Sequence, residues 1–195
     1  MNRKEFNRQE TKNHIRKVFL QMYAGHDIHD ITIQDLCREA GVVKSTFYSY
    51  YDDKYSVLDE IETEMLQHLA EINARLEDVN VGQVLRGNPL EQASKTVDYL
   101  LDHLDEFRIV MGSHGDPRFE NMWRRDIADS FEDRFLKEKR DPQRAGLACA
   151  IFSSTLMGIY RYFIFQNPTI SKEDFALILG NTFKYALQDF LPGKR

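Results

Sequence analysis

The stretch GVVKSTFYSYYDDK, residues 41–54, carries four aromatic rings within five positions. A helical run this short cannot bury four large rings on one side, so some of them must face outward. At about 100° per residue, Phe47 and Tyr51 share one side of a helix that we expect over roughly residues 44–50. These two rings should pack inward and hold the short helix on its support.

The other side of this helix is rich in hydrogen-bond donors. Two serines point away from the packed rings, a threonine and a tyrosine lie on the flanks, and lysines stand at both ends. Such groups suit the phosphates and base edges of nucleic acid. The alternative interpretation is a small helical hairpin with a solvated polar face. The residues concerned are Lys44, Ser45, Thr46, Tyr48, Ser49 and Lys54.

The preceding segment supplies the support for this helix. Thr32 has the position of an N-cap, Asp35 has the capping-box position, and Gly41 ends a helix expected over residues 33–40. Two short helices joined by a three-residue turn match a helix-turn-helix, whose second helix enters the major groove. The formal net charge of −5 does not oppose this, because residues 1–17 hold a local basic excess.

The remaining sequence predicts helices and no strands. Apolar stripes at helical spacing run through residues 15–23, follow residue 53, run from Leu90 through Leu101 to Leu104, and recur towards the C-terminus, where Ser171 has the position of an N-cap. Residues 79–89 have the composition of a linker, and residues 112–117 break the helical pattern. Asp-Pro pairs at 116–117 and 141–142 each favour a new helix start. We therefore expect an all-α protein of about nine helices.

One segment tests whether the chain is soluble. Residues 145–165 are nearly long and apolar enough to span a bilayer. Arg161, a polar patch at residues 153–155 and amphipathic helices on both sides favour a fully buried helix in a bundle. Cys37 and Cys149 lie far apart, which argues against a disulfide framework and indicates a reducing compartment. The charged start lacks an apolar leader, so we expect a cytoplasmic protein without a membrane anchor.

The segment TIQDLCREAGVVKSTFYSYYDDKYSVL resembles the DNA-binding signature of the TetR family of bacterial transcription regulators. The resemblance is close over residues 8–60, and over the rest it covers only the number and order of helices. It implies a helix-turn-helix domain at residues 1–54 and a helical domain for ligand binding and dimerisation at residues 55–195. Val43 departs from the frequent serine cap, and Asp52 and Asp53 add negative charge near the expected phosphate path. Asp53 is expected to cap the following helix instead of contacting DNA.

Carried over position by position, the resemblance implies a set of DNA contacts. Thr32 would touch a phosphate, Tyr50 would contact a phosphate or pack, and Lys54 would act together with the start of its helix. Major-groove and backbone contacts would come from Lys44, Ser45, Thr46, Tyr48 and Ser49. The partner is double-stranded DNA with a near-palindromic operator, because a two-fold dimer places two recognition helices about one helical turn apart.

The C-terminal part carries weaker signals. Small residues at every fourth position from Gly146 to Gly158 would allow close helix approach, so a homodimer through the last two helices is expected, or packing within one chain. A small-molecule effector is possible in this part, and its candidate residues are His103, Trp123, Arg161 and Tyr162. Arg161 needs an anionic ligand or an acidic side chain as its partner. No cofactor is implied, and the histidine spacing argues against a metal site.

The leading hypothesis is a ligand-responsive dimeric repressor. An alternative is a DNA-tethered regulator whose C-terminal domain binds a protein instead of a small molecule. A helical enzyme is not expected, because no nucleophile–base grouping, phosphate loop or paired carboxylates in an apolar setting can be found.

Overall fold

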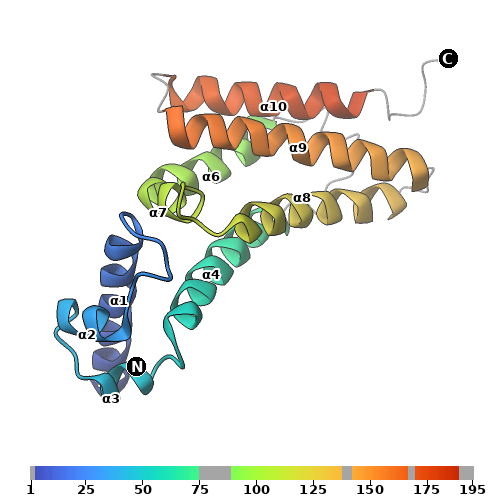
Figure 1. The fold of residues 1–195 in the computed structure, drawn as a ribbon. Coiled ribbons are helices and arrows are strands. Elements are labelled where there is room, and N and C mark those ends of the chain that lie inside the picture. Colours follow the sequence, from blue (N-terminus) through green and yellow to red (C-terminus); the bar gives the residue numbers. More distant parts are fainter. Residues whose placement is uncertain (1–2, 75–88, 138–141, 167–169, 189–195) are drawn as a thin grey trace. The chain divides into compact units, whose positions relative to one another are not determined.

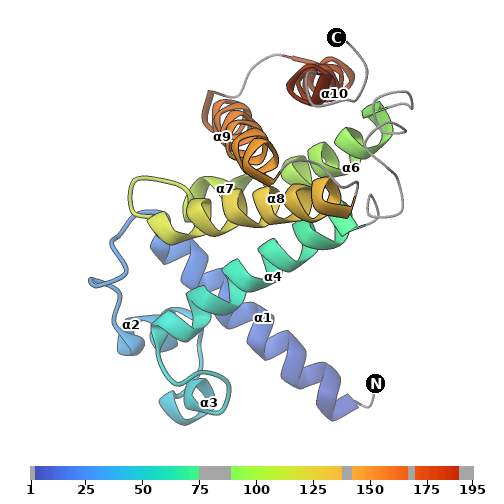
Figure 2. The same cartoon turned by 90° about the vertical axis from the view of Figure 1, so that its right-hand side faces the viewer.

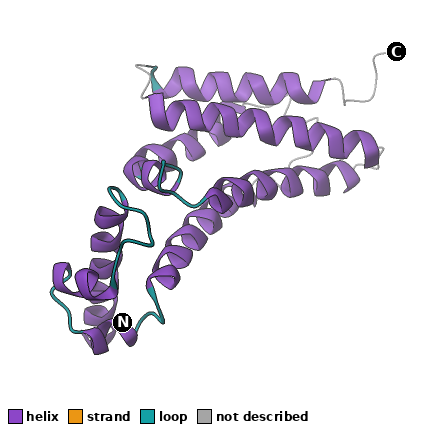
Figure 3. Cartoon of the chain, viewed as in Figure 1, coloured by secondary structure: helices purple, strands orange, loops and turns teal. Residues whose placement is uncertain are grey.

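The computed structural model describes residues 3–74, 89–137, 142–166 and 170–188, and within these ranges the chain forms nine α-helices and no strand (Figures 1 and 3). This confirms the all-α prediction. The helices are α1 (Arg3–Tyr23), α2 (Ile33–Glu39), α3 (Lys44–Tyr48), α4 (Lys54–Ala74), α6 (Pro89–Asp102), α7 (Leu104–Val110), α8 (Pro117–Lys137), α9 (Pro142–Gln166) and α10 (Lys172–Gln188).

The chain divides into two compact units. Unit 1 comprises Met1–Met65 and Asp105–Pro117, and unit 2 comprises Leu66–Leu104 and Arg118–Arg195. Helix α4 belongs to unit 1 up to Met65 and to unit 2 beyond it. The linker expected at residues 79–89 lies almost entirely outside the described residues.

In unit 1, the inner face of α1 follows the predicted stripe. Ile15, Val18, Phe19 and Tyr23 are buried, together with Leu36 and Cys37 of α2 and with Val57, Leu58 and Ile61 of α4. Apolar residues three and four positions apart fall on one side of a helix, so each helix contributes one face to this core.

Both ends of α2 are fixed by local hydrogen bonds. Thr32 is the N-cap, as predicted, and its Oγ1 accepts a hydrogen bond from the backbone N–H of Asp35 at 3.1 Å. At the other end Gly41 has φ +61° and donates to the carbonyl of Arg38, while Val42 donates to that of Cys37. These paired bonds form a Schellman motif, in which glycine takes the left-handed conformation at least cost. The chain therefore turns sharply into α3.

In unit 2, α10 packs against both α6 and α9 (Figure 2). Stacked rings hold the core: Trp123 of α8 lies against Tyr160 of α9 at 4.9 Å between centroids, and Phe163 lies against Phe175 of α10 at 4.0 Å. Ser171 caps α10 as predicted, since its Oγ accepts from the backbone N–H of Asp174 at 3.0 Å. Aromatic stacking thus joins α8 to α9 and α9 to α10.

Two details of unit 2 differ from expectation. The stripe after Pro89 was expected to continue through Leu101 to Leu104, but α6 ends at Asp102 and α7 begins at Leu104, and Leu101 is 42% exposed. In addition, α9 is not buried all round. The segment Ala145–Gln166 is long and apolar enough to cross a membrane by length and composition, which the core helix of a soluble protein also satisfies, and half of its most apolar window is buried.

Candidate nucleic-acid interface

The recognition helix α3 is anchored by the two predicted rings. Phe47 is fully buried, and Tyr51 is 5% exposed with its ring centroid 5.7 Å from that of Phe47. The helix covers only Lys44–Tyr48, two residues fewer than expected, and Ser49 is its C-cap. Val43 is the N-cap and makes no side-chain capping bond, so tertiary packing, not local capping, holds α3 in place.

The outer side of α3 lies at the surface, as the periodicity predicts. Tyr48 is 54% exposed, and its ring meets Phe47 edge-on at 5.6 Å. Ser49 donates its hydroxyl hydrogen to the carbonyl of Thr46 at 2.7 Å, which fixes the direction of that side chain. Lys44, Ser45, Tyr48 and Ser49 are exposed, and Thr46 is half-buried.

A polar cluster ties α1 to α4 behind the recognition helix. The Tyr51 hydroxyl donates to Glu60 Oε2 at 2.6 Å, and Lys12 of α1 forms an ion pair with the same carboxylate. One turn further, Arg16 pairs with Glu64 at 2.5 Å. Burial and then the hydrogen bond to Glu60 raise the pKa of Tyr51. Burial also acts to raise the pKa of Glu60, but the bonds from Lys12 and Tyr51 outweigh it and lower that pKa below its ordinary value.

Tyr50 meets a different basic residue of α1. Its ring is half-buried, and the guanidinium carbon of Arg8 lies 5.5 Å above the ring centroid. The sequence predicted either packing or phosphate contact for Tyr50. The structure shows that the side chain of Arg8 lies over its ring.

Lys54 lies at the start of α4 and is tied to the loop that precedes α2. Its Nζ donates to the carbonyls of His29 at 3.0 Å and Ile31 at 2.8 Å. The hydroxyl oxygen of Tyr55 lies 3.0 Å from Nδ1 of His29, at hydrogen-bond distance. A phosphate contact by Lys54 stays a prediction, and the structure shows that this ammonium also positions the loop.

Two residues near the expected phosphate path, Asp53 and Thr32, are engaged in local helix caps. Asp53 caps α4, as predicted, because its Oδ1 accepts from the backbone N–H of Ser56 at 2.8 Å, and this bond lowers the pKa of Asp53. Thr32 is also engaged locally, since its hydroxyl donates to Asp35 Oδ2 at 2.6 Å. Phosphate contact by Thr32 therefore stays a prediction, and a phosphate would compete with Asp35 Oδ2 for the hydroxyl hydrogen of Thr32.

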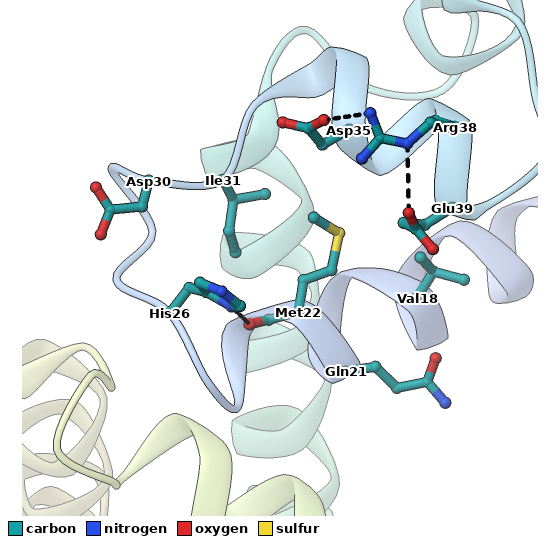
Figure 4. Close-up of a pocket in the computed structure, with 9 residues that line it drawn as sticks. All are labelled: Val18, Gln21, Met22, His26, Asp30, Ile31, Asp35, Arg38 and Glu39. Atoms are coloured by element: carbon teal, nitrogen blue, oxygen red, sulfur yellow. Dashed lines mark hydrogen bonds and ion pairs between the residues drawn. The ribbon is translucent and has the colours of Figure 1, made fainter.

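A groove elsewhere on unit 1 is lined by acidic side chains, unlike the outer side of α3. It encloses about 540 Å3 between α1, the following loop and α2, with Met22 and Ile31 on its floor (Figure 4). Arg38 is turned towards Asp35 and Glu39 and pairs with both, at 2.8 and 3.4 Å. Its acidic lining makes this groove unsuited to phosphate, and the outer side of α3 is the better candidate.

The structure does not bring the four effector candidates together. His103 stacks on Tyr99 at 4.5 Å, and Trp123 is a buried core ring. Arg161 pairs with Glu120 at 2.9 Å and is 52% exposed, so an acidic side chain on a neighbouring helix meets it. Tyr162 is exposed beside an apolar groove of about 390 Å3 between α9 and α10.

A second groove of unit 2 was missed from the sequence. It encloses about 590 Å3 between α8 and α9, and Arg118, Arg124 and Arg125 line it together with the buried Cys149 and Ser153. The seven-residue spacing of Arg118 and Arg125 places both on one side of a helix, a signal that the sequence already contained.

Neither cysteine has the character of a reactive thiol. Burial, then Glu132 and Asp129, raise the pKa of Cys149 to about 11, and burial raises that of Cys37. Over the described part of the chain, no group of three or more His, Cys, Asp and Glu residues could hold a metal ion.

Together, α2, the sharp turn at Gly41 and the anchored α3 define a helix-turn-helix DNA-binding protein. Residues 17–61 match the family model described as "Bacterial regulatory proteins, tetR family". This match confirms the resemblance that the sequence predicted: the helix-turn-helix part of the chain is of the TetR-family type.

Relatives agree with this assignment. The transcriptional regulator MftR of Mycobacterium tuberculosis, named for mycofactocin biosynthesis, is 28% identical over 74 residues. That match spans 37% of this chain and 35% of MftR, so the chain covers about a third of that relative.

Solved structures extend the likeness of the fold to most of the chain. A TetR transcriptional regulator from Streptococcus agalactiae has a TM-score of 0.63 and 21% identity, covering 92% of this chain and 97% of its own. The dihydroxyacetone kinase operon activator DhaS has a TM-score of 0.60 and 17% identity, with the same coverage.

Proposed function

We propose that this TetR-family regulator is a ligand-responsive dimeric repressor that acts in the cytoplasm on a near-palindromic operator. The observation that carries the proposal is the division of α3 into two sides. Phe47 and Tyr51 are buried, while hydroxyl and ammonium groups occupy the side turned to solvent. A helix held in this way can enter a major groove without losing its anchorage.

DNA binding is assigned to residues 1–54 and effector binding with dimerisation to residues 55–195. Lys44, Ser45 and Ser49 would read base edges, while Thr46 and Tyr48 would contact the backbone. Thr32 and Lys54 would add phosphate contacts, and Tyr50 would either contact a phosphate or pack. Substituting Lys44 or Ser49 should change which operators are preferred, so equal losses on all operators would count against base readout by these residues.

The dimer is proposed through α9 and α10. Leu147 and Ile151 of α9 are 61% and 54% exposed. Ile178 of α10 is an exposed apolar residue as well. Nothing lies within 4 Å of a Cβ built on Gly158, so another helix could approach closely there. An exposed apolar surface of this kind favours a protein partner, and a second copy satisfies it symmetrically.

The effector is proposed to be a small anionic molecule bound in unit 2. The groove between α8 and α9 supports this, because Arg118, Arg124 and Arg125 line it beside apolar residues. Its binding would favour a conformation of the dimer that no longer fits the operator.

Selection of duplexes from a randomised library with the full-length chain tests the DNA-binding function. We expect an enriched two-fold sequence with half-sites one helical turn apart. Transcription in vitro from a promoter overlapping that sequence should fall when the protein is added. Failure to enrich any sequence would contradict the proposal, and increased transcription would contradict the repressor assignment.

The effector part of the proposal has a separate test. A panel of organic carboxylates and phosphates is screened by thermal unfolding, and a compound that raises the melting temperature should also release the selected duplex. The double variant Arg118→Ala/Arg125→Ala should lose that response and keep DNA binding. An unchanged response would exclude this groove as the effector site.

A further inference from the structure

Three basic side chains of α1 are spaced four residues apart and meet different kinds of partner. Lys12 and Arg16 lie against the carboxylates of Glu60 and Glu64. Arg8, one turn nearer the N-terminus, lies over the neutral ring of Tyr50. Residues at this spacing share one side of a helix. Lys12 also lies over a ring, that of Tyr51 at 5.7 Å, so Arg8 differs from it, among the described residues, in meeting a ring without a carboxylate.

This difference matters for the electrostatics of unit 1. A carboxylate offsets the positive charge of its partner, whereas an aromatic ring holds a cation without neutralising it. Guanidinium presents five N–H donors in one plane, and these can still meet an acceptor while the face rests on a ring. Stacking thus restricts the orientation of Arg8 and leaves its charge available.

The place of the stack links it to the recognition helix. Ser49 is the C-cap of α3, and Tyr50 follows it directly. Arg8 is exposed and reaches this position from α1, while Tyr50 is half-buried. A fixed positive charge therefore lies at the C-terminal end of α3, beside the side proposed to face DNA.

We propose that Arg8 is a further DNA-contacting residue, binding a backbone phosphate, and that Tyr50 is its positioning residue. The proposal deepens the proposed function and rests on it. Arginine binds phosphate oxygens through paired N–H donors, and phosphate contacts fix the orientation of a protein on its duplex. Tyr50 then acts through Arg8 instead of contacting a phosphate through its own hydroxyl.

The first test is the salt dependence of DNA binding by full-length variants. Two duplexes are used, the site recovered by selection and a shuffled duplex of the same composition. Arg8→Ala should weaken binding to both by roughly tenfold at low salt and reduce the slope of log K against log salt by about one. Lys17→Ala is the matched control, since Lys17 is an exposed base on the opposite side of α1 and should leave the slope unchanged.

The second test separates positioning from direct contact. Tyr50→Phe keeps the ring and should bind like the wild type, whereas Tyr50→Leu should bind several-fold more weakly. The double variant Arg8→Ala/Tyr50→Leu should bind no more weakly than Arg8→Ala alone, because both changes remove one interaction. Thermal unfolding checks that each variant is folded.

Three results would overturn this proposal: an unchanged salt slope in Arg8→Ala, additive losses in the double variant, or equal losses in Tyr50→Phe and Tyr50→Leu. If the wild type bound neither duplex, the proposed function itself would fail, and this inference with it. Normal wild-type binding with an unaffected Arg8→Ala variant would overturn only the inference.

Discussion

The outer side of α3 and the outer side of α9 are both exposed, but they differ in what they offer a partner. Lysine and hydroxyl groups lie outward on α3, whereas Leu147, Ile151 and Tyr162 lie outward on α9. Water solvates the first set well, so its exposure has little cost. Removing apolar surface from water stabilises a complex by about 25 cal/mol per Å2, so a partner that covers the exposed side chains of α9 is favoured. The comparison separates a surface suited to a charged polymer from one suited to another protein.

The largest effect is expected from a charge on the apolar side of α9. Leu147→Glu should weaken dimerisation by about 3–6 kcal/mol, because a two-fold interface loses two buried leucines at once. Sedimentation equilibrium measures the change. Leu101→Glu is the control, since Leu101 is an exposed leucine of α6 outside the proposed interface. If both variants dimerised equally well, the apolar side of α9 would not be the dimer interface.

A slightly smaller effect is expected from the anchor of α3. Phe47→Ala should lower the free energy of unfolding by about 3–5 kcal/mol, because a fully buried ring leaves a cavity. The neighbouring Tyr48→Ala should change it by about 0.5 kcal/mol or less while still weakening DNA binding. Urea denaturation and duplex binding together measure both. Comparable stability losses would show that the two rings do not have separate roles.

The turn before α3 gives a third prediction. Gly41→Ala should lower the free energy of unfolding by about 1–2 kcal/mol, the cost of a left-handed conformation for a residue with a Cβ. An added Cβ meets nothing within 4 Å, so the cost comes from the backbone alone. Gly25→Ala, which is equally open and has no positive φ, is the control for the same chemical change. If Gly41→Ala weakened DNA binding but left the free energy of unfolding unchanged, the predicted cost of the left-handed conformation would be contradicted.

The smallest effect concerns pH. Because Lys12 and Tyr51 lower the pKa of Glu60, its contribution is present above the unfolded-state pKa of about 4.3 and is lost as pH falls through the lower folded-state value. Glu60→Gln should therefore be less stable than the wild type near pH 7, by about 1 kcal/mol or less, and the difference should shrink in acid. Denaturation series at several pH values measure it, with the exposed Glu71→Gln as the control.

Most of unit 1 could be predicted from the sequence, because its determinants are local. The N-caps at Thr32 and Asp53, the turn at Gly41 and the inward direction of Phe47 and Tyr51 each depend on residues within a few positions. Such short-range rules hold before tertiary structure is known. The length of α3 was overestimated at its C-terminal end, where Ser49 is already the C-cap and its hydroxyl donates to the carbonyl of Thr46.

The stack of Arg8 on Tyr50 could not be predicted in the same way. The two residues are 42 positions apart, and only the packing of α1 against the region after α3 brings them together. The partners of the effector candidates could not be predicted for a similar reason. Trp123 and Tyr160 satisfy each other as core rings, and Arg161 meets Glu120 on another helix. Helical spacing gives a direction for each side chain, but not its partner.

The shortness of α3 has a consequence for how such regulators diverge. Its five residues include only one fully buried anchor, and the exposed Lys44 and Ser45 contribute little to the core. If Lys44 and Ser45 read base edges as proposed, substitutions at these two positions alter operator preference without loss of stability. A duplicated gene could acquire a new target through single-residue changes while every intermediate still folds.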